Sequence, residues 1–501
     1  MNARRKNRGL RSLLLAAGLL AAGLAPFAVA AQSWEIRSGL NPHRETLRGV
    51  VDVRYCPGGG MVSVGTQRVP PGTSGLDNII VERVYTTMPL GAPSWRYSYD
   101  SGFSEQGGGI VEYTDGSGFA IVGSRIESTS PLLTRLTISK IDCNGNMVWH
   151  RGYSWTAGSN VSWDIIRAST GTPALNTNPG DLIALGEYTV NGLNYARIVR
   201  VKSQGQLIWT RDYGVAAGLQ LYSRGIAEVD TPSATDHLVV AGGLGNNATI
   251  FEVDGDNGTF VCGTQSPGLG VSRFNDITRH GGVTSIAPGF TAVGETRAPA
   301  GGSSQAYVAS YTTGPAAPCA LTNQVQWGSS AANESAQAVT TTYGNTFTSV
   351  PVGSLLIAGN IVGPYSTNPN SADVWTHVMT PIALTPFSSP SYTTGQRFGT
   401  FMAGLSGGET VADVTESTNG GFFVGTTFSP WISGDLQHGY TTWMRAANTG
   451  TQCSVPWSAP VTTLTLSSAF VLPSTRFDPS VILPALPRSP INAAYCCNIG
   501  P

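Results

Sequence analysis

The sequence predicts an all-β fold, and three observations support this prediction. A short apolar run that ends in glycine recurs along the chain, and each copy has the length and composition of a buried strand. A tryptophan recurs at a similar distance from most of these runs. Apolar stripes with the helical period of 3.6 residues do not recur over any useful length. We therefore expect strands joined by turns along the whole chain.

The apolar run occurs seven times, at intervals of 52 to 66 residues, and its glycines are Gly65, Gly123, Gly186, Gly242, Gly294, Gly359 and Gly425. The aromatic marker that closes most units is Trp95, Trp149, Trp209, Trp327 and Trp457. A unit of this size buries only one apolar face and must stack on copies of itself. Repeats of about 40 to 50 residues are typical of β-propellers, and longer units fit blades with inserted loops. The prediction is a seven-bladed β-propeller of four-stranded antiparallel blades over residues 31–457.

Two polar loops, Asp142–Asn146 and Asp254–Gly258, place oxygen-bearing side chains at alternate positions, as calcium loops do. Neither loop has the downstream acidic residue that completes a calcium site. Asparagine and glycine tolerate the positive φ that tight hairpins need. We therefore interpret both loops as hairpin turns between the last two strands of a blade.

Three segments, Lys140–Trp149, Trp209–Gly214 and Ser417–Gly425, resemble the repeats of bacterial secreted β-propellers. The resemblance extends over roughly residues 34–457. It implies secretion and a scaffold or binding role, and it supplies no catalytic residues. The run from Asp142 to Trp149 is also similar to the tryptophan-docking motif of quinoprotein dehydrogenases, but it is one residue short.

The two ends of the chain depart from the repeat. Residues 1–30 have the basic start, the apolar run and the Ala28-Val29-Ala30 cleavage site of a signal peptide, which predicts an exported, secreted or periplasmic protein without a transmembrane segment. The strand Ser33–Arg37 either joins the last blade and closes the ring or adds an outer strand. Residues 458–501 form an irregular tail, in which five prolines between Pro473 and Pro490 break regular structure. This tail either packs on the propeller surface or is loosely ordered.

Cysteine and charge usage agree with export. Charged residues make up 12% of the chain and the net charge is −1, which is not typical of nucleic-acid binders. Seven cysteines leave at least one without an intramolecular partner. Because Cys143, Cys262, Cys319 and Cys453 fall near turns of different blades, we expect most of them not to pair with one another. The disulfide candidates are Cys56, Cys319, Cys453, Cys496 and Cys497. We expect Cys319 and Cys453 to bind their own long turns or neighbouring loops, and Cys496 and Cys497 to hold the tail on the propeller, with Cys56 as a candidate partner.

The candidate binding residues are the first polar residues of the innermost strands, namely Arg48, Asp164, Arg224, Asp276, Gln337 and Asp413. Propellers commonly bind ligands where such groups converge at the channel mouth. The alternative is that each side chain holds the backbone of a neighbouring blade. No catalytic set, metal site or cofactor motif is recognisable, since the histidines lack zinc spacing and no nucleophile elbow or phosphate loop is present.

Three functions fit these observations. The first is a non-catalytic exported scaffold that binds a protein or a cell-surface glycan. The second is a polysaccharide hydrolase or lyase that uses the carboxylates of Asp164, Asp276 and Asp413 in the channel. The third is a structural surface protein linked through an unpaired cysteine.

Overall fold

The computed structural model describes residues 34–38, 44–68, 76–85, 95–130, 132–214, 219–230, 236–266, 270–280, 289–297, 302–312, 319–328, 332–343, 352–362, 372–381, 384, 395–398, 407–418, 421–430 and 438–444, and six short strands between 454 and 490. All of these residues belong to one compact unit, Ser33–Ile499. The expected signal peptide lies outside the described residues.

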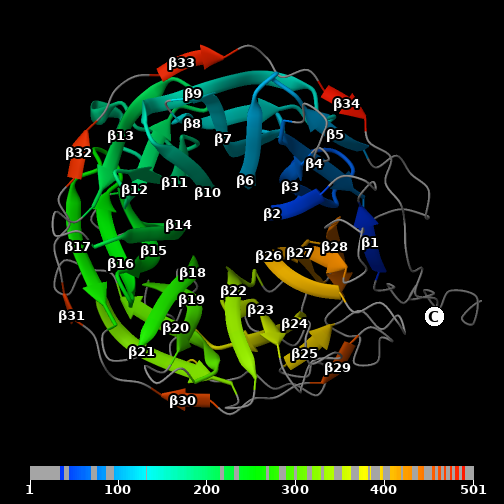
Figure 1. Ribbon diagram of the computed structural model, residues 1–501, viewed down its shortest axis with the longest axis vertical. Helices are drawn as coiled ribbons and strands as arrows, with labels where there is room; N and C mark the ends of the chain where they lie inside the picture. Colours follow the sequence, from blue (N-terminus) through cyan, green and yellow to red (C-terminus); the bar gives the residue numbers. More distant parts are fainter. Residues whose placement is uncertain are drawn as a thin grey trace, which may run out of the picture. The chain divides into compact units, whose positions relative to one another are not determined.

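The described strands form seven antiparallel sheets around a central channel, and six of the sheets have five strands (Figure 1). We call these six sheets blades 1 to 6, and four consecutive strands build each of them. Blade 1 contains β2 (Arg44–Asp52), β3 (Met61–Arg68), β4 (Asn78–Val84) and β5 (Trp95–Tyr99). Blade 2 contains β6 (Ser104–Glu112), β7 (Phe119–Thr129), β8 (Leu132–Ile141) and β9 (Met147–Ala157). Blade 3 contains β10 (Ser159–Arg167), β11 (Leu182–Val190), β12 (Leu193–Val201) and β13 (Leu207–Tyr213), with the short 3₁₀ helix η1 (Pro173–Leu175) after β10.

The other three blades have the same order of strands. Blade 4 contains β14 (Leu221–Asp230), β15 (Asp236–Leu244), β16 (Asn247–Asp254) and β17 (Phe260–Gln265). Blade 5 contains β18 (Val271–His280), β19 (Gly289–Arg297), β20 (Ser304–Thr312) and β21 (Ala320–Trp327). Blade 6 contains β22 (Asn333–Thr341), β23 (Leu355–Val362), β24 (Ala372–Met379) and β25 (Gly395–Phe398).

The remaining sheet, which we call the closing sheet, has four strands from both ends of the chain. It contains β26 (Gly407–Ser417), β27 (Gly421–Pro430), β28 (His438–Met444) and the N-terminal strand β1 (Trp34–Ser38). Strand β1 pairs antiparallel with β28, with Trp34 opposite Trp443. The first of the two expectations for the N-terminal strand is thus met, since it joins the last repeat and covers the edge of β28. Trp457, expected to close the last repeat, lies outside the described residues, and the strand before it belongs to blade 6.

The last part of the chain, from Ser454 onward, adds a fifth strand to every blade. Its strands are β29 (Ser454–Pro456), β30 (Val461–Thr463), β31 (Ser468–Ala469), β32 (Ser474–Arg476), β33 (Ser480–Leu483) and β34 (Arg488–Pro490), which together we call the belt. They pair in order with β25, β21, β17, β13, β9 and β5, so the belt runs around the outside of the ring from blade 6 back to blade 1 (Figure 1).

The belt corrects two expectations. The propeller of antiparallel strands is confirmed, but the sequence predicts seven equal four-stranded blades, whereas six five-stranded blades and one four-stranded composite sheet are present. The tail of residues 458–501 is not irregular throughout, because five of its segments, β30 to β34, are edge strands. Strands this short, separated by prolines, are typical of sheet edges.

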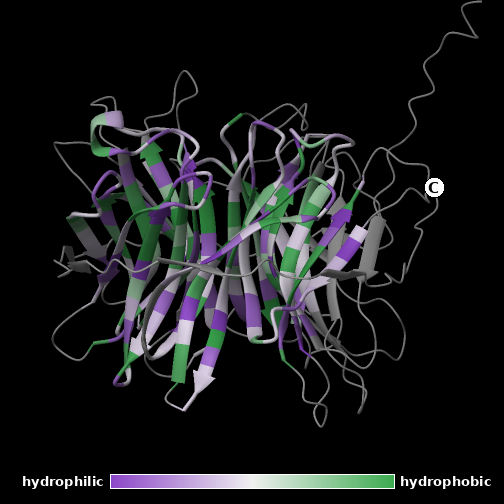
Figure 2. Ribbon diagram, turned by 90° about the horizontal axis from the view of Figure 1, so that it is seen from above, coloured by the Kyte–Doolittle hydropathy of each residue, from purple (hydrophilic) through white to green (hydrophobic). Residues whose placement is uncertain are grey.

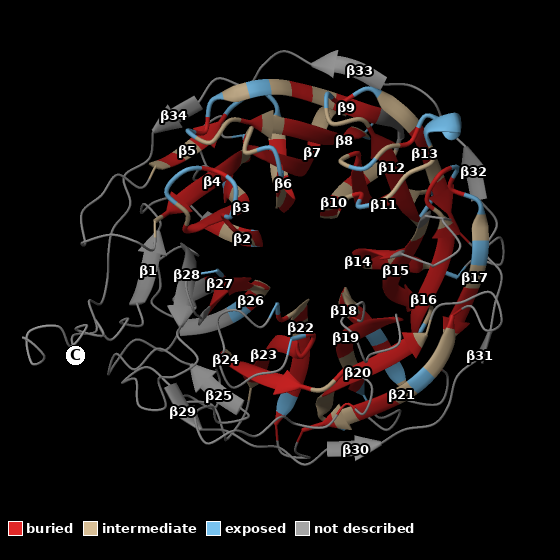
Figure 3. Cartoon of the chain, turned by 180° about the vertical axis from the view of Figure 1, so that it is seen from behind, coloured by how far each residue is buried: buried red, intermediate tan, exposed pale blue. Residues whose placement is uncertain are grey.

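The core lies between neighbouring blades. Residues of blade 3, such as Ile183 and Ile198, pack with residues of blade 4, such as Val240 and Phe251, in one buried cluster. Hydrophobic and hydrophilic residues alternate in bands along the strands (Figure 2), and exposed residues gather on the outer strands, for example β17 and β21 (Figure 3). Each blade therefore needs both neighbours to bury its two faces.

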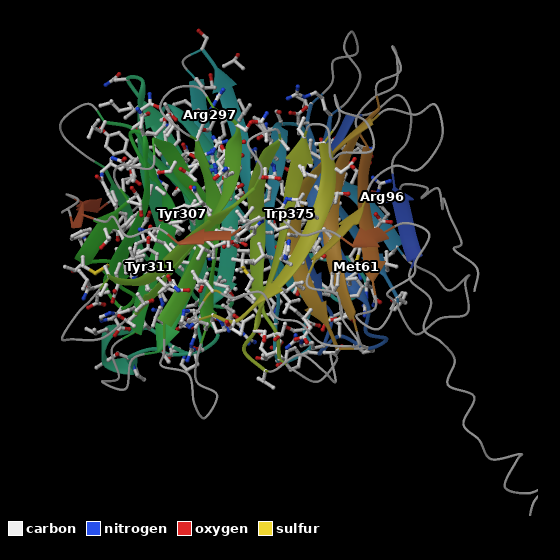
Figure 4. The ribbon with its side chains drawn as sticks, turned by 90° about the horizontal axis from the view of Figure 1, so that it is seen from below. Met61, Arg96, Arg297, Tyr307, Tyr311 and Trp375 are labelled. Carbon is white, nitrogen blue, oxygen red and sulfur yellow. A yellow bond between two sulfur atoms is a disulfide. The ribbon has the colours of Figure 1, made fainter. Side chains whose placement is uncertain are left out.

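Tyrosine and tryptophan side chains on the outer strands link blades 1 to 4 to one another by hydrogen bonds. Tyr99, Tyr153 and Tyr213 end three outer strands, and their hydroxyls donate to the carbonyl oxygens of Gly145, Gly205 and Gly258 in the next blade at 2.8, 2.6 and 2.6 Å. The indole N–H groups of Trp95 and Trp209 donate to neighbouring carbonyls in the same turns. Elsewhere in the ring, the hydroxyl of Tyr307 in blade 5 (labelled in Figure 4) donates a hydrogen bond to Ser266 Oγ at 2.9 Å.

The two calcium-like loops are two of the three turns that receive the tyrosine contacts. Asp142 Oδ1 accepts hydrogen bonds from the backbone N–H groups of Asn144 and Asn146 at 2.9 and 2.8 Å. Asp254 Oδ1 likewise accepts from the N–H of Asp256 at 2.8 Å. The carboxylates therefore serve as acceptors inside the turns, as the hairpin interpretation predicts.

Two disulfides join neighbouring blades. Cys56, after β2 of blade 1, is bonded to Cys143 in the β8–β9 turn of blade 2. Cys262 in β17 of blade 4 is bonded to Cys319, just before β21 of blade 5. Disulfides of this kind indicate an oxidising compartment. No helix within the described ranges is long and apolar enough to cross a membrane.

These pairs correct two expectations about the cysteines. Cys56 does not pin the tail, because it is bonded to Cys143. Cys262 and Cys319 do pair, because a strand and a turn of adjacent blades meet at the blade interface, which the spacing along the sequence does not reveal. The other candidates, Cys453, Cys496 and Cys497, lie outside the described residues.

Candidate functional site

Every innermost strand carries a β-bulge where it passes the channel. The register shifts by one residue in six sheets, at bulge positions Arg48, Trp163, Arg224, Asn275, Gln337 and Ala412. In blade 2 the bulge contains Gly108 and Gly109. Bulges bend a strand and re-aim its side chains. We call this set the bulge ring.

The bulge ring borders a cavity of about 430 Å³ in the channel. All six predicted residues line it, namely Arg48, Asp164, Arg224, Asp276, Gln337 and Asp413. Trp163, Asn275 and Arg273 also line it and were not predicted. Counting back along the sequence from the glycine marker correctly predicts that Asp164 and Asp276 line the cavity. It misses the preceding residues, Trp163 and Asn275, because a bulge turns two successive residues toward the channel.

In three sheets an aspartate follows the bulge by one residue and links its own strand to the next sheet by hydrogen bonds; the three are Asp164, Asp276 and Asp413. In each carboxylate, Oδ1 accepts the N–H of the following residue at 2.7 Å, at Ile165, Ile277 and Val414. The other oxygen accepts an N–H from the next sheet, with Asp164 bound to Ile226 at 3.1 Å, Asp276 to Val339 at 2.7 Å and Asp413 to Val50 at 2.8 Å. We call these contacts the carboxylate clasps, and they are the backbone-holding role considered for these residues.

Small residues alternate with the clasps around the ring. The position after the bulge is Gly49 in blade 1, Gly225 in blade 4 and Ala338 in blade 6. A β-carbon added at Gly225 would lie 2.8 Å from Asp276 Oδ1, which is too close for an unstrained contact. The Asp276 carboxylate therefore needs a small residue at position 225 of the adjacent blade.

The three carboxylates of the clasps are buried, and burial changes their pKa values. Burial raises the pKa of Asp164 to about 6 and that of Asp413 to about 7, against the backbone hydrogen bonds that lower both. The pKa of Asp276 is raised well above its usual value, by burial first and then by the charges of Asp164 and Asp413. The three groups therefore lie near enough to repel one another.

We expect the folded protein to lose stability as pH rises through these pKa values. An aspartate whose pKa is higher in the folded than in the unfolded chain holds its proton better when folded, so stability is highest near the unfolded pKa and falls toward neutral pH. The loss between about pH 5 and about pH 8 should be on the order of 4 kcal/mol, measured by urea unfolding at each pH. Asp413→Asn should flatten this dependence, and an unchanged slope would contradict the assignment.

The cationic part of the cavity is built on Trp163. The Arg224 guanidinium lies 3.6 Å from the centre of the indole ring, and the Arg48 guanidinium lies 4.9 Å from it. Glu187 fixes this arrangement, since its Oε2 accepts from Trp163 Nε1 at 3.0 Å and pairs with Arg224 at 2.5 Å. We call Arg48, Trp163, Arg224 and Glu187 the cationic platform.

Arg48 is the member of the platform that has no acidic partner among the described residues. Burial and the charge of Arg224 lower its pKa. It reaches from blade 1 to Trp163 of blade 3 past blade 2, whose bulge residues Gly108 and Gly109 have no side chains. Two guanidinium groups share the Trp163 ring, and only that of Arg224 is paired with a carboxylate among the described residues, so the pair favours a further anion.

The two amide residues of the bulge ring are already engaged. Asn275 donates to the carbonyl oxygen of Ala336 at 2.9 Å, across to blade 6. Gln337 donates to Ser335 Oγ at 2.7 Å. Arg273 pairs with Glu295 at 2.6 Å. Arg48 is therefore the side chain of the cavity best placed to receive an acidic ligand.

No family model and no curated protein matches this chain. Among solved structures, the chain is similar to Sqt1 from Chaetomium thermophilum, at 10% sequence identity and a TM-score of 0.40. The similarity covers 83% of this chain and 99% of that one.

Proposed function

We propose that the protein is an exported, non-catalytic propeller scaffold that binds an acidic group of a protein or of a cell-surface glycan in its channel. One observation carries the proposal: Arg48 faces a cavity of about 430 Å³ from a fixed platform and has no acidic partner among the described residues. Cavities of roughly 300 to 1,000 Å³ with a few convergent polar groups are typical ligand sites. Charge-assisted hydrogen bonds from a guanidinium to a carboxylate are among the stronger polar contacts.

The alternative, a hydrolase or lyase acting on polysaccharide, finds less support. Such chemistry needs two carboxyl groups, one acid and one base or nucleophile, that are free to face a substrate. Each of Asp164, Asp276 and Asp413 already accepts backbone N–H bonds with both oxygens. Their raised pKa values follow from burial. The third function, a disulfide-linked surface protein, depends on Cys453, Cys496 and Cys497, which lie outside the described residues.

We expect the purified protein to bind uronic-acid oligosaccharides or an acidic peptide better than their neutral counterparts. Arg48→Ala should weaken this binding by about tenfold or more, because one charge-assisted contact is worth about 1.5 to 3 kcal/mol. The measurement is calorimetric titration of each probe at two salt concentrations, with product analysis of the same samples. The two probes distinguish a glycan from a protein source of the acidic group.

Arg68→Ala is the matched control, since Arg68 is an exposed arginine paired with Asp77 and does not line the cavity. It should bind as the unmodified protein does. Equal binding by the Arg48→Ala variant would contradict the proposed site. Products released from the oligosaccharide would contradict the non-catalytic role, and Asp164, Asp276 and Asp413 would then be the residues to replace.

A further inference from the structure

A buried carboxylate lies against both sulfurs of the disulfide between blades 4 and 5. Glu252 Oε2 is 3.4 Å from Cys262 Sγ and 3.8 Å from Cys319 Sγ. The ligand atoms of these three residues all lie within 4.8 Å of one another. The Glu252 side chain is 1% exposed. The arrangement follows from the register, because Glu252 of β16 is paired directly with Cys262 of β17.

The two oxygens of Glu252 differ in their partners. Oε1 is hydrogen-bonded to His237 Nδ1, and the two side chains form an ion pair when the imidazole is protonated. The contacts of Oε2 are with the two disulfide sulfurs, which carry no hydrogen to donate. A buried carboxylate oxygen without a donor is unfavourable. Two thiols or a metal ion in this place would satisfy it.

The other disulfide shows that this contact is not a general feature of the fold. A carboxylate, Glu112, also lies near Cys56, but its oxygens accept the backbone N–H groups of Arg54, Tyr55 and Cys56 at 2.7, 3.0 and 2.7 Å. Cys143 Sγ lies 3.1 Å from the carbonyl oxygen of Gly116 instead. The Glu252 oxygen is therefore directed at sulfur, whereas the Glu112 oxygens are directed at the backbone.

We propose that the Cys262–Cys319 disulfide is the oxidised form of a zinc site whose ligands are Cys262, Cys319 and Glu252. Two thiolates and one carboxylate are ligands that Zn²⁺ prefers, and three protein ligands leave a fourth position for water. His237 acts as a positioning residue, since its hydrogen bond to Oε1 orients the ligating carboxylate. The half-buried His237 and Cys262 provide the path from solvent to the site.

The change between the two forms is a two-electron step. A dithiol reductant transfers two electrons and two protons to the S–S bond, which breaks to give two thiols while the reductant becomes a disulfide. Zn²⁺ then replaces the two thiol protons, which are released to solvent. The two cysteines can therefore bind a metal ion under reducing conditions, but under oxidising conditions the disulfide prevents binding.

The test uses the full chain with Cys56→Ser and Cys143→Ser, so that the disulfide under study is the only one of the two that remains. After reduction with a phosphine and its removal, we expect one Co²⁺ per chain with a thiolate-to-cobalt charge-transfer band, and displacement of Co²⁺ by Zn²⁺. Glu252→Gln should weaken binding, and His237→Ala should weaken it by about tenfold. The unreduced protein should bind no metal with this band.

The matched control carries Cys262→Ser and Cys319→Ser and keeps Cys56 and Cys143, whose sulfurs face a carbonyl oxygen. It should show no such band after the same reduction. A second measurement covers the case in which reduction loosens the blade: Zn²⁺ should protect Cys262 and Cys319 from alkylation, read by peptide mass spectrometry. Equal bands in the two variants, or equal alkylation with and without Zn²⁺, would overturn the proposal.

Discussion

A chain that ends at Pro460 should lose much of its stability and aggregate. This truncation removes β30 to β34 and so uncovers the outer edges of β21, β17, β13, β9 and β5. Each lost backbone hydrogen bond is worth about 0.5 to 1.5 kcal/mol net, so the free energy of unfolding should fall by more than about 5 kcal/mol. Exposed sheet edges also pair with other chains. Urea unfolding and light scattering measure the two effects.

A chain that ends at Pro490 is the control, because it keeps all six belt strands. It should unfold at the same urea concentration as the full chain and scatter light no more strongly than the full chain does. If both truncated chains behave like the full chain, the belt does not stabilise the ring. The spacing of the belt supports its role: its strands begin six to eight residues apart, and an extended chain rises about 3.3 Å per residue, which is enough to step from blade to blade.

Replacing a clasp aspartate should have the next largest effect. Asp276→Ala removes the acceptor for the N–H groups of Ile277 and Val339, and so breaks a direct link between blades 5 and 6. The substitution leaves two largely buried N–H groups without an acceptor, which should lower the free energy of unfolding by about 2 to 4 kcal/mol. Removal of a buried charge offsets part of this loss. The measurement is the midpoint and slope of urea unfolding at about pH 7, where the acid groups of the ring are partly ionised.

Asp100→Ala is the control for this prediction. The Asp100 carboxylate also accepts a backbone N–H, that of Gly102 at 2.8 Å, but within one exposed turn. Its loss should change stability by less than about 1 kcal/mol, because solvent replaces the missing acceptor. Equal, small effects at the two positions would show that the carboxylates do not hold the blades together.

The glycine-ended runs and the tryptophan markers were enough to predict a propeller. These signals depend only on residues that are close together in the sequence. The composition of Phe119–Gly123 indicates a buried strand, and the residue types of Asp142–Asn146 indicate a hairpin turn. The count from the glycine marker also placed Asp164, Asp276 and Asp413 at the channel, since the innermost strand pairs in a fixed register with the strand that carries the marker.

Three features depend on contacts between segments far apart in the sequence. The belt strands are two to four residues long, which is too short for a sequence pattern to specify a partner, so their pairing depends on the free edges they meet. The bulge that turns Trp163 toward Arg48 is a local irregularity without a sequence signature. The Cys262–Cys319 bond forms because blades 4 and 5 meet there.

The sequence by itself therefore determined the repeating strands, the turns and the polar residues of the channel, because each depends on neighbours along the chain. The tertiary structure alone decided how the ring closes through Trp34–Ser38, where the tail lies, which cysteines pair and which side chains share a cavity. These outcomes depend on which strand edges and which carboxylates still lack hydrogen-bond partners when the blades have packed side by side.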